Sequence, residues 1–142
     1  MKGQHRIIRE IFLFAIGVAI TSFIVLSFNN VQYATNKLAM NDQMTSVSNL
    51  VTSGIIKATE SEESIIRIEI PEKMSGETYI INIDGNDGEI IVSLFDDPSI
   101  NLTKKIFNIN QDYFMTGNVI STARFFEITR EGNNIKIKRS VI

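Results

Sequence analysis

The N-terminal part of the chain contains one long apolar run. It spans residues 11–28, reads IFLFAIGVAITSFIVLSF and carries no charge. The hydrocarbon core of a bilayer is about 30 Å thick, and a helix needs about 20 mostly apolar residues to cross it. Residues 11–28 therefore predict a transmembrane helix whose flanking residues lie at the interface. The alternative is the core helix of a soluble domain, but a chain of 142 residues has little other material to surround such a helix.

Residues 29–60 predict an amphipathic extension of that helix. Apolar positions recur there at spacings of three and four residues, which places them on one helical face. These positions are Met40, Met44, Val47, Val51, Ile55 and Ala58. No proline occurs before Pro71, so nothing interrupts a helix between the two stretches. Two uses of this apolar stripe are open: packing on the protein's own sheet, or packing against copies of the chain.

From residue 61 onward the apolar period changes to two, which is typical of strands. The clearest alternating runs cover 64–70, 79–83 and 90–94, and weaker ones cover 105–110, 119–120, 125–129 and 135–138. Turn-forming residues separate them, as in Asp84-Gly85-Asn86-Asp87-Gly88. About six or seven short strands in roughly 80 residues predict a small antiparallel β-sandwich or a curled β-sheet. The fold class is α+β.

The predicted organisation has four parts. They are a basic cytoplasmic tail (1–10), the transmembrane helix (11–28), the helical extension (29–60) and an exterior β domain (61–142). Basic residues precede the span, whereas uncharged amides follow it. The positive-inside rule therefore predicts a single-pass protein of the cell membrane with a cytoplasmic N-terminus and an exterior C-terminal domain.

A cleaved secretory signal peptide is the alternative interpretation of the apolar run. Such peptides have an apolar core of about 7–15 residues followed by a small-residue cleavage site. The run in this chain is longer and ends in Ser27-Phe28-Asn29-Asn30. A permanent anchor is the better interpretation.

Composition argues against several classes of function. A net charge of −2 and a pI of about 5.4 disfavour nucleic-acid binding. The absence of cysteine excludes disulfides and thiol catalysis, and the single histidine, His5, disfavours a catalytic triad or a multi-histidine metal site. The loop at Asp84 lacks the glycine at position six and the glutamate at position twelve of an EF-hand. We expect no enzyme activity, cofactor or metal.

Two sites carry other candidate chemistry. Glu10 lies at the membrane boundary, where a carboxylate is costly unless it is solvated or paired. Arg6 lies one turn earlier and is placed to pair with it, and the alternative is that Glu10 faces a charged group on a neighbouring subunit. Asn101-Leu102-Thr103 fits the acceptor pattern for N-glycosylation.

Lys2-Gly3-Gln4 is followed by Glu10 and an apolar helix, and residues 68–83 form a strand–turn–strand pattern. In these features the chain resembles archaeal type IV pilin-like proteins, which carry class III signal peptides. It implies that a prepilin peptidase cuts between Gly3 and Gln4 and that the exposed helix packs into a filament. The family's glutamate usually stands fifth in the mature chain, a position that Ile8 would occupy in this sequence.

These observations lead to one functional expectation and one alternative. We expect a pilin-like structural or assembly subunit of an archaeal cell-surface filament or related envelope machinery. Its partners would be the lipid bilayer and, through the helix, itself or other pilin-like subunits, but not nucleic acid. The alternative is an uncleaved single-pass membrane protein whose exterior β domain binds a protein or a solute.

Overall fold

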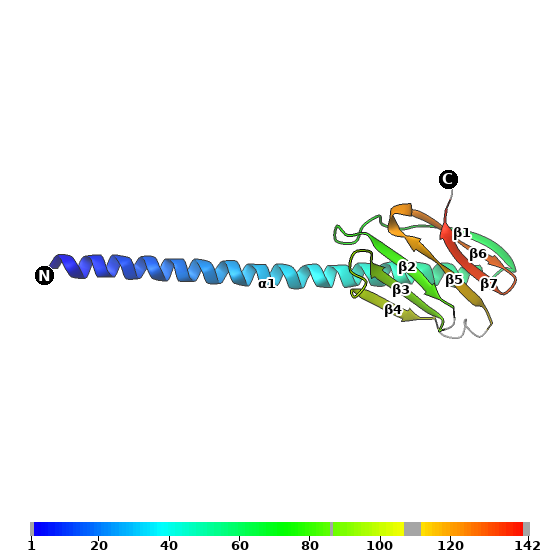
Figure 1. Cartoon of the computed structure of the whole chain (residues 1–142), viewed down its shortest axis with the longest axis horizontal. Coiled ribbons are helices and arrows are strands. Elements are labelled where there is room, and N and C mark those ends of the chain that lie inside the picture. Colours follow the sequence, from blue (N-terminus) through cyan, green and yellow to red (C-terminus); the bar gives the residue numbers. More distant parts are fainter. Residues whose placement is uncertain (1, 86, 107–111, 141–142) are drawn as a thin grey trace. The chain divides into compact units, whose positions relative to one another are not determined.

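The computed structural model describes residues 2–85, 87–106 and 112–140, with side chains from residue 5 onward. One helix, α1 (Lys2–Ala58), precedes the strands (Figure 1). The other elements are β1 (Glu63–Glu69), β2 (Tyr79–Asp84), β3 (Glu89–Leu94), β4 (Asn101–Lys105), β5 (Phe114–Ile120), the short 3₁₀ helix η1 (Ser121–Ala123), β6 (Phe125–Glu131) and β7 (Asn134–Arg139). The chain forms two compact units, residues 1–38 and 39–142. Each unit is described by itself.

The first unit is the N-terminal part of α1. Every described side chain from His5 to Leu38 is exposed, and the large apolar side chains of residues 11–28 are between 47 and 74% exposed. The hydroxyl groups in this unit follow the helix: Thr21 Oγ1 donates to the carbonyl of Gly17 at 2.9 Å. A hydroxyl bonded to the preceding turn does not require water, so it is compatible with an apolar environment.

The second unit is built on one seven-stranded sheet with the order β1-β6-β7-β5-β2-β3-β4. Five of the six strand pairs are antiparallel, and β5 pairs with β7 in parallel. The sheet is therefore mixed, open and curled. Of the two expected architectures, the curled sheet is confirmed, and the one parallel pair departs from the antiparallel prediction.

One face of the sheet packs on the C-terminal part of α1. Five residues of the predicted stripe are buried there: Met44, Val47, Val51, Ile55 and Ala58. At Gly54 the helix comes so close that a Cβ atom would collide with the Cδ1 atoms of Ile68 and Ile128. Along these residues the stripe packs on the protein's own sheet.

The strand expected at 105–110 falls mainly on residues 107–111, which lie outside the described part of the chain. Among the described residues, β4 begins earlier, at Asn101, and ends at Lys105. The turn before β4 explains the shift. The Asp97 carboxylate accepts hydrogen bonds from the backbone and the hydroxyl of Ser99, and this reverses the chain two residues before Asn101.

Arg130 connects the end of α1 to the sheet. Its guanidinium donates to the carbonyls of Thr59 and Ser61, both at 2.8 Å, and to that of Gly132 at 2.7 Å. It also lies 4.8 Å from the centre of the Tyr113 ring. The carbonyls at a helix C-terminus have no partners within the helix and attract cations, so this buried arginine stabilises the turn between α1 and β1.

Candidate functional site: the apolar helix and the open face of the sheet

The N-terminal part of α1 is long and apolar enough to cross a membrane. Within its own unit no other element covers its side chains, which leaves the whole apolar surface available to lipid or to other helices. A shallow hollow of about 370 Å³ lies on this helix, lined by Phe14, Gly17, Val18, Thr21 and Ser22. Gly17 contributes no side chain to this hollow, and a Cβ atom placed there would meet nothing within 4 Å.

Arg6 and Glu10 lie one helical turn apart at the start of the span. Arg6 Nε donates to Glu10 Oε1 at 3.4 Å, and the two side chains are 84 and 66% exposed. A pair this exposed contributes at most about 0.5 kcal/mol in water. Its greater effect is that the Arg6 cation balances the charge of Glu10 next to the apolar run.

The other residues singled out from the sequence lie in two separate places. Gly3 and Gln4 belong to the first turns of α1, and their side chains lie outside the described ones. Asn101 is the exposed first residue of β4, and its side-chain nitrogen donates to the carbonyls of Pro98 and Ser99 at 3.0 and 3.4 Å. A glycosyl transfer to this nitrogen would therefore require the turn to open.

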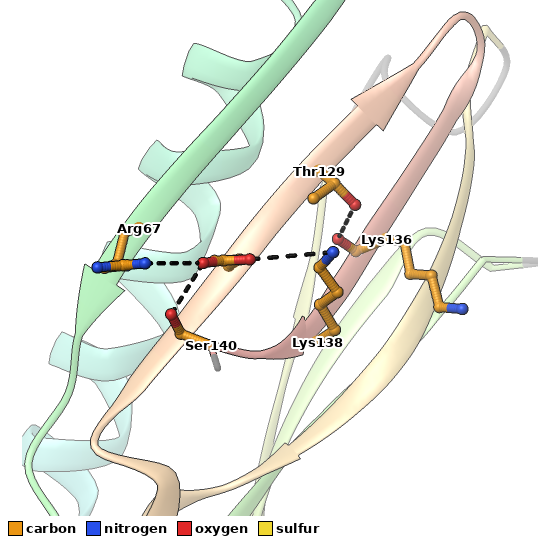
Figure 2. A network of polar contacts seen from close by, with 6 residues as sticks. Arg67, Thr129, Lys136, Lys138 and Ser140 are labelled. Carbon is orange, nitrogen blue, oxygen red and sulfur yellow. Dashed lines mark hydrogen bonds and ion pairs between the residues drawn. The ribbon is translucent and has the colours of Figure 1, made fainter. Parts of the chain in front are cut away.

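A polar network on the sheet face opposite α1, the open face, was not foreseen from the sequence (Figure 2). Its centre is Glu127 on β6. One carboxylate oxygen accepts from Arg67 Nη2 on β1 at 3.1 Å and from Ser140 Oγ at 2.8 Å, while the other lies 3.9 Å from Lys138 Nζ on β7. The hydrogen bonds from Ser140 and Arg67 lower the pKa of Glu127. The network joins three strands and the chain beyond β7.

A shallow groove of about 520 Å³ lies next to β1 and is lined by residues from both faces of the sheet. Its lining combines charged side chains with one apolar one, Ile65, which is 72% exposed. The lining residues are Glu63, Ser64, Ile65, Thr129, Arg130, Glu131, Gly132 and Lys138. A single exposed isoleucine is common on protein surfaces, so Ile65 does not by itself mark a contact surface.

Within the described residues, no group of three histidine, cysteine or acidic side chains is placed to hold a metal ion. The Asp84 loop joins β2 to β3, with Gly88 at a φ of 65°. Positive φ at glycine is the usual requirement of such hairpin turns. The described residues offer two surfaces for interaction: an apolar helix and an open sheet with two edges.

Comparison of the chain with known protein families, with curated proteins and with solved structures finds no match. What the sequence and the structure define is an architecture. A membrane helix near the N-terminus is followed by an α+β domain with one curled sheet.

Proposed function

We propose that this protein is a pilin-like structural subunit that is anchored in the cell membrane through α1 and carries its sheet domain outside the cytoplasm. One observation carries the proposal. The N-terminal part of α1 exposes a charge-free apolar surface, and the same helix continues into the core of the sheet domain. Such a surface needs lipid or other apolar helices around it.

The continuity of the helix separates a structural role from simple tethering. A tether needs only a span and a flexible linker, and flexible linkers are rich in glycine and serine. In this chain, helical residues lead directly from the span to Val47 and Val51, which are buried against the sheet. A helix shared between the span and the domain core suits a subunit that assembles through its helix.

The N-terminal residues fit the same role. Lys2-Gly3-Gln4 resembles a prepilin peptidase site, and cleavage there would leave Gln4 as the new N-terminus. Arg6 and Glu10 would then lie within the first two turns of the mature helix, where they can pair within one chain or exchange partners with neighbouring subunits.

Assembly through the helix is tested by filling the hollow at Gly17. The change Gly17→Leu places its Cβ where no atom lies within 4 Å and adds an apolar residue to the span, so it should leave membrane insertion and folding intact. Ala19→Leu is the matched control, because it lies about 200° away around the helix. We expect Gly17→Leu to reduce the fraction of protein recovered in large assemblies after mild detergent extraction at least threefold, and Ala19→Leu to leave it unchanged.

Two results would contradict the proposal. Monomers of the unaltered chain in extracts of its native membranes would favour the tethered binding module. Protection of the sheet domain from protease added outside intact cells, with digestion after lysis, would contradict the exterior placement.

A further inference from the structure

The two edge strands of the sheet, β1 and β4, present unpaired backbone groups within the described part of the chain. In a strand, the N–H and C=O of one residue point to the same side, and the side alternates along the chain. On β1, the carbonyl of Glu62 and the N–H of Ile70 bond to the β6 side. The residues whose backbone groups point away from β6 are therefore the odd-numbered ones: Glu63, Ile65, Arg67 and Glu69.

The same reasoning applies to β4. The carbonyl of Ile100 bonds to Leu94, and the N–H of Ile106 bonds to Gly88, so the even-numbered residues face β3. The outward backbone groups belong to Asn101, Thr103 and Lys105. On both edges these outward residues are also the ones whose side chains are exposed on the open face.

The parallel pair β5–β7 makes the two edges complementary. In a fully antiparallel sheet of seven strands, the first and last strands run in the same direction. One parallel pair reverses this, so β1 and β4 run in opposite directions. For a given face of the sheet, the strand direction decides to which side the backbone groups of a residue point. Because β1 and β4 run in opposite directions, the outward residues of both edges lie on the same face of the sheet. The edges therefore meet both conditions for antiparallel pairing with each other: they run in opposite directions, and their outward residues lie on the same face.

We propose that β1 of one copy of this chain pairs with β4 of the next, which extends the sheet from subunit to subunit. The interface is head-to-tail, so each copy keeps one free edge, and repetition produces a row, a ring or a helical filament. Sheet domains paired in this way all share one orientation, because β1 and β4 of one copy run in opposite directions. The inference goes beyond the proposed function: it rests on anchoring in a common membrane and not on processing of the N-terminus.

Pairing of β1 with β1 of another copy is the competing arrangement. Antiparallel self-pairing turns the second copy by 180° about an axis perpendicular to the sheet. The part of α1 that packs on the sheet would then run in opposite directions in the two copies. Head-to-tail pairing instead keeps this part of α1 in the same direction in every copy.

Charge selects one register of the head-to-tail pairing. It places Glu63 opposite Lys105, Ile65 opposite Thr103, and Arg67 opposite Asn101. In this register, Lys105 lies between Glu63 of the neighbouring copy and its own partner Glu89, whose carboxylate is 3.2 Å away. Moving Lys105 two or four residues along β1 would instead place it on the rung next to Arg67 or on the same rung, and like charges across a ladder are destabilising. The exposed Ile65 gains a β-branched neighbour, a favourable cross-strand pair.

The strength of this contact suits a membrane-confined protein. Three facing pairs supply about six backbone hydrogen bonds, each with a modest net contribution in water. Anchoring raises the effective concentration of neighbouring copies, which favours weak contacts that fail in dilute solution. The test therefore uses the full chain in its membrane.

Introduced cysteines test the pairing directly, because the chain has none of its own. Facing residues of a hydrogen-bonded pair are about 5.5 Å apart at Cα, which suits a disulfide. Within one copy, the edges are six strand spacings apart, about 29 Å along the sheet, so a bond within one chain is excluded. On mild oxidation of membranes, we expect the double variant Ile65→Cys/Thr103→Cys to form a ladder of dimers, trimers and larger species.

The control variants make the outcome specific. Thr103→Cys/Lys136→Cys pairs the same edge with the exposed face of the central strand β7 and should remain monomeric. A double variant without a ladder overturns the proposal, and dimers from Ile65→Cys alone show self-pairing and also overturn it. Faster cross-linking of Ile65→Cys/Lys105→Cys than of Ile65→Cys/Thr103→Cys overturns the register.

Charge reversal supplies a second readout. In the cross-linking background, Glu63→Lys should slow ladder formation about two- to fivefold at low salt, as expected for loss of one exposed ion pair. Glu62→Lys is the matched control, because its carbonyl already bonds to Gly132 and its rate should not change. Equal rates for the two variants contradict the Glu63–Lys105 contact. If a chain that keeps residues 1–3 forms the ladder, the edge pairing stands, and the missing cleavage refutes the processed-pilin function.

Discussion

Truncation of Ile55 tests whether the C-terminal part of α1 is held by the protein's own sheet. Ile55 has no exposed surface, whereas its neighbour Ile56 is 48% exposed. The pair Ile55→Ala and Ile56→Ala therefore makes the same chemical change in consecutive residues of one helix. Only the first removes a side chain from the interface between helix and sheet.

The expected magnitudes follow from burial. Loss of a fully buried isoleucine removes about 1.5–3 kcal/mol of transfer free energy and leaves a cavity, so the total is about 2–5 kcal/mol. The half-exposed Ile56 loses less, and alanine is the better helix former, which leaves a change within about 1 kcal/mol. With a urea dependence of about 1–3 kcal/mol per molar, Ile55→Ala should lower the unfolding midpoint by about 1–3 M.

The assay is pulse proteolysis of the full chain in detergent micelles across a urea series, which reports the folded fraction of the sheet domain. The midpoints should not depend on protein concentration, because the contact lies within one chain. Equal midpoints for the two variants would refute the packing described above. A loss of stability that disappears at high protein concentration would show that the stripe packs against copies instead.

Three further changes probe the sheet domain by the same urea assay. Arg130→Met removes three hydrogen bonds to carbonyls and the contact with the Tyr113 ring, so it should lower the free energy of unfolding by about 2–4 kcal/mol. The control Arg124→Met, at an exposed position, should lower it by less than about 1 kcal/mol. Similar losses for the two variants would contradict the role of Arg130. Gly117 has a φ of 124°, and a Cβ there would collide with the backbone of Ile137, so Gly117→Ala should lower the free energy of unfolding by more than about 2 kcal/mol. Gly132 has a φ of 59° and open space around it, so Gly132→Ala should lower it by about 1 kcal/mol. The reverse order would refute the close approach of β5 and β7. Because the pKa of Glu127 is lowered in the folded state, its contribution to stability is complete above the ordinary pKa of a glutamic acid and is lost as pH falls through the lower folded-state pKa. Glu127→Gln should weaken this acid dependence, and an unchanged pH profile would contradict the network.

The elements that depend on local patterns were predictable from the sequence. The apolar run at 11–28 and the stripe from Met44 to Ala58 both lie on α1, and the stripe is buried as its period of three and four residues predicted. The first three strands also follow from alternation, because one face of each strand is more buried than the other. These features need no knowledge of the strand order.

The features that depend on long-range pairing were not predictable. The parallel pairing of β5 with β7 depends on which strands become neighbours, and nothing in residues 114–120 indicates it. The same is true of Glu127, whose partners lie on β1, on β7 and beyond β7. Arg130 is buried because the helix end places the carbonyls of Thr59 and Ser61 beside it, and no local pattern around residue 130 indicates these distant partners. The complementary edges emerge only once the strand order is known.

The most direct test of the central claim is the intact mass of the protein purified from its native membranes, beside that of a Gly3→Val variant. The account predicts a native chain that has lost residues 1–3 and begins at Gln4, and a variant that keeps them. A native chain that still begins at Met1 would contradict the pilin-like function and leave a permanently tethered exterior domain.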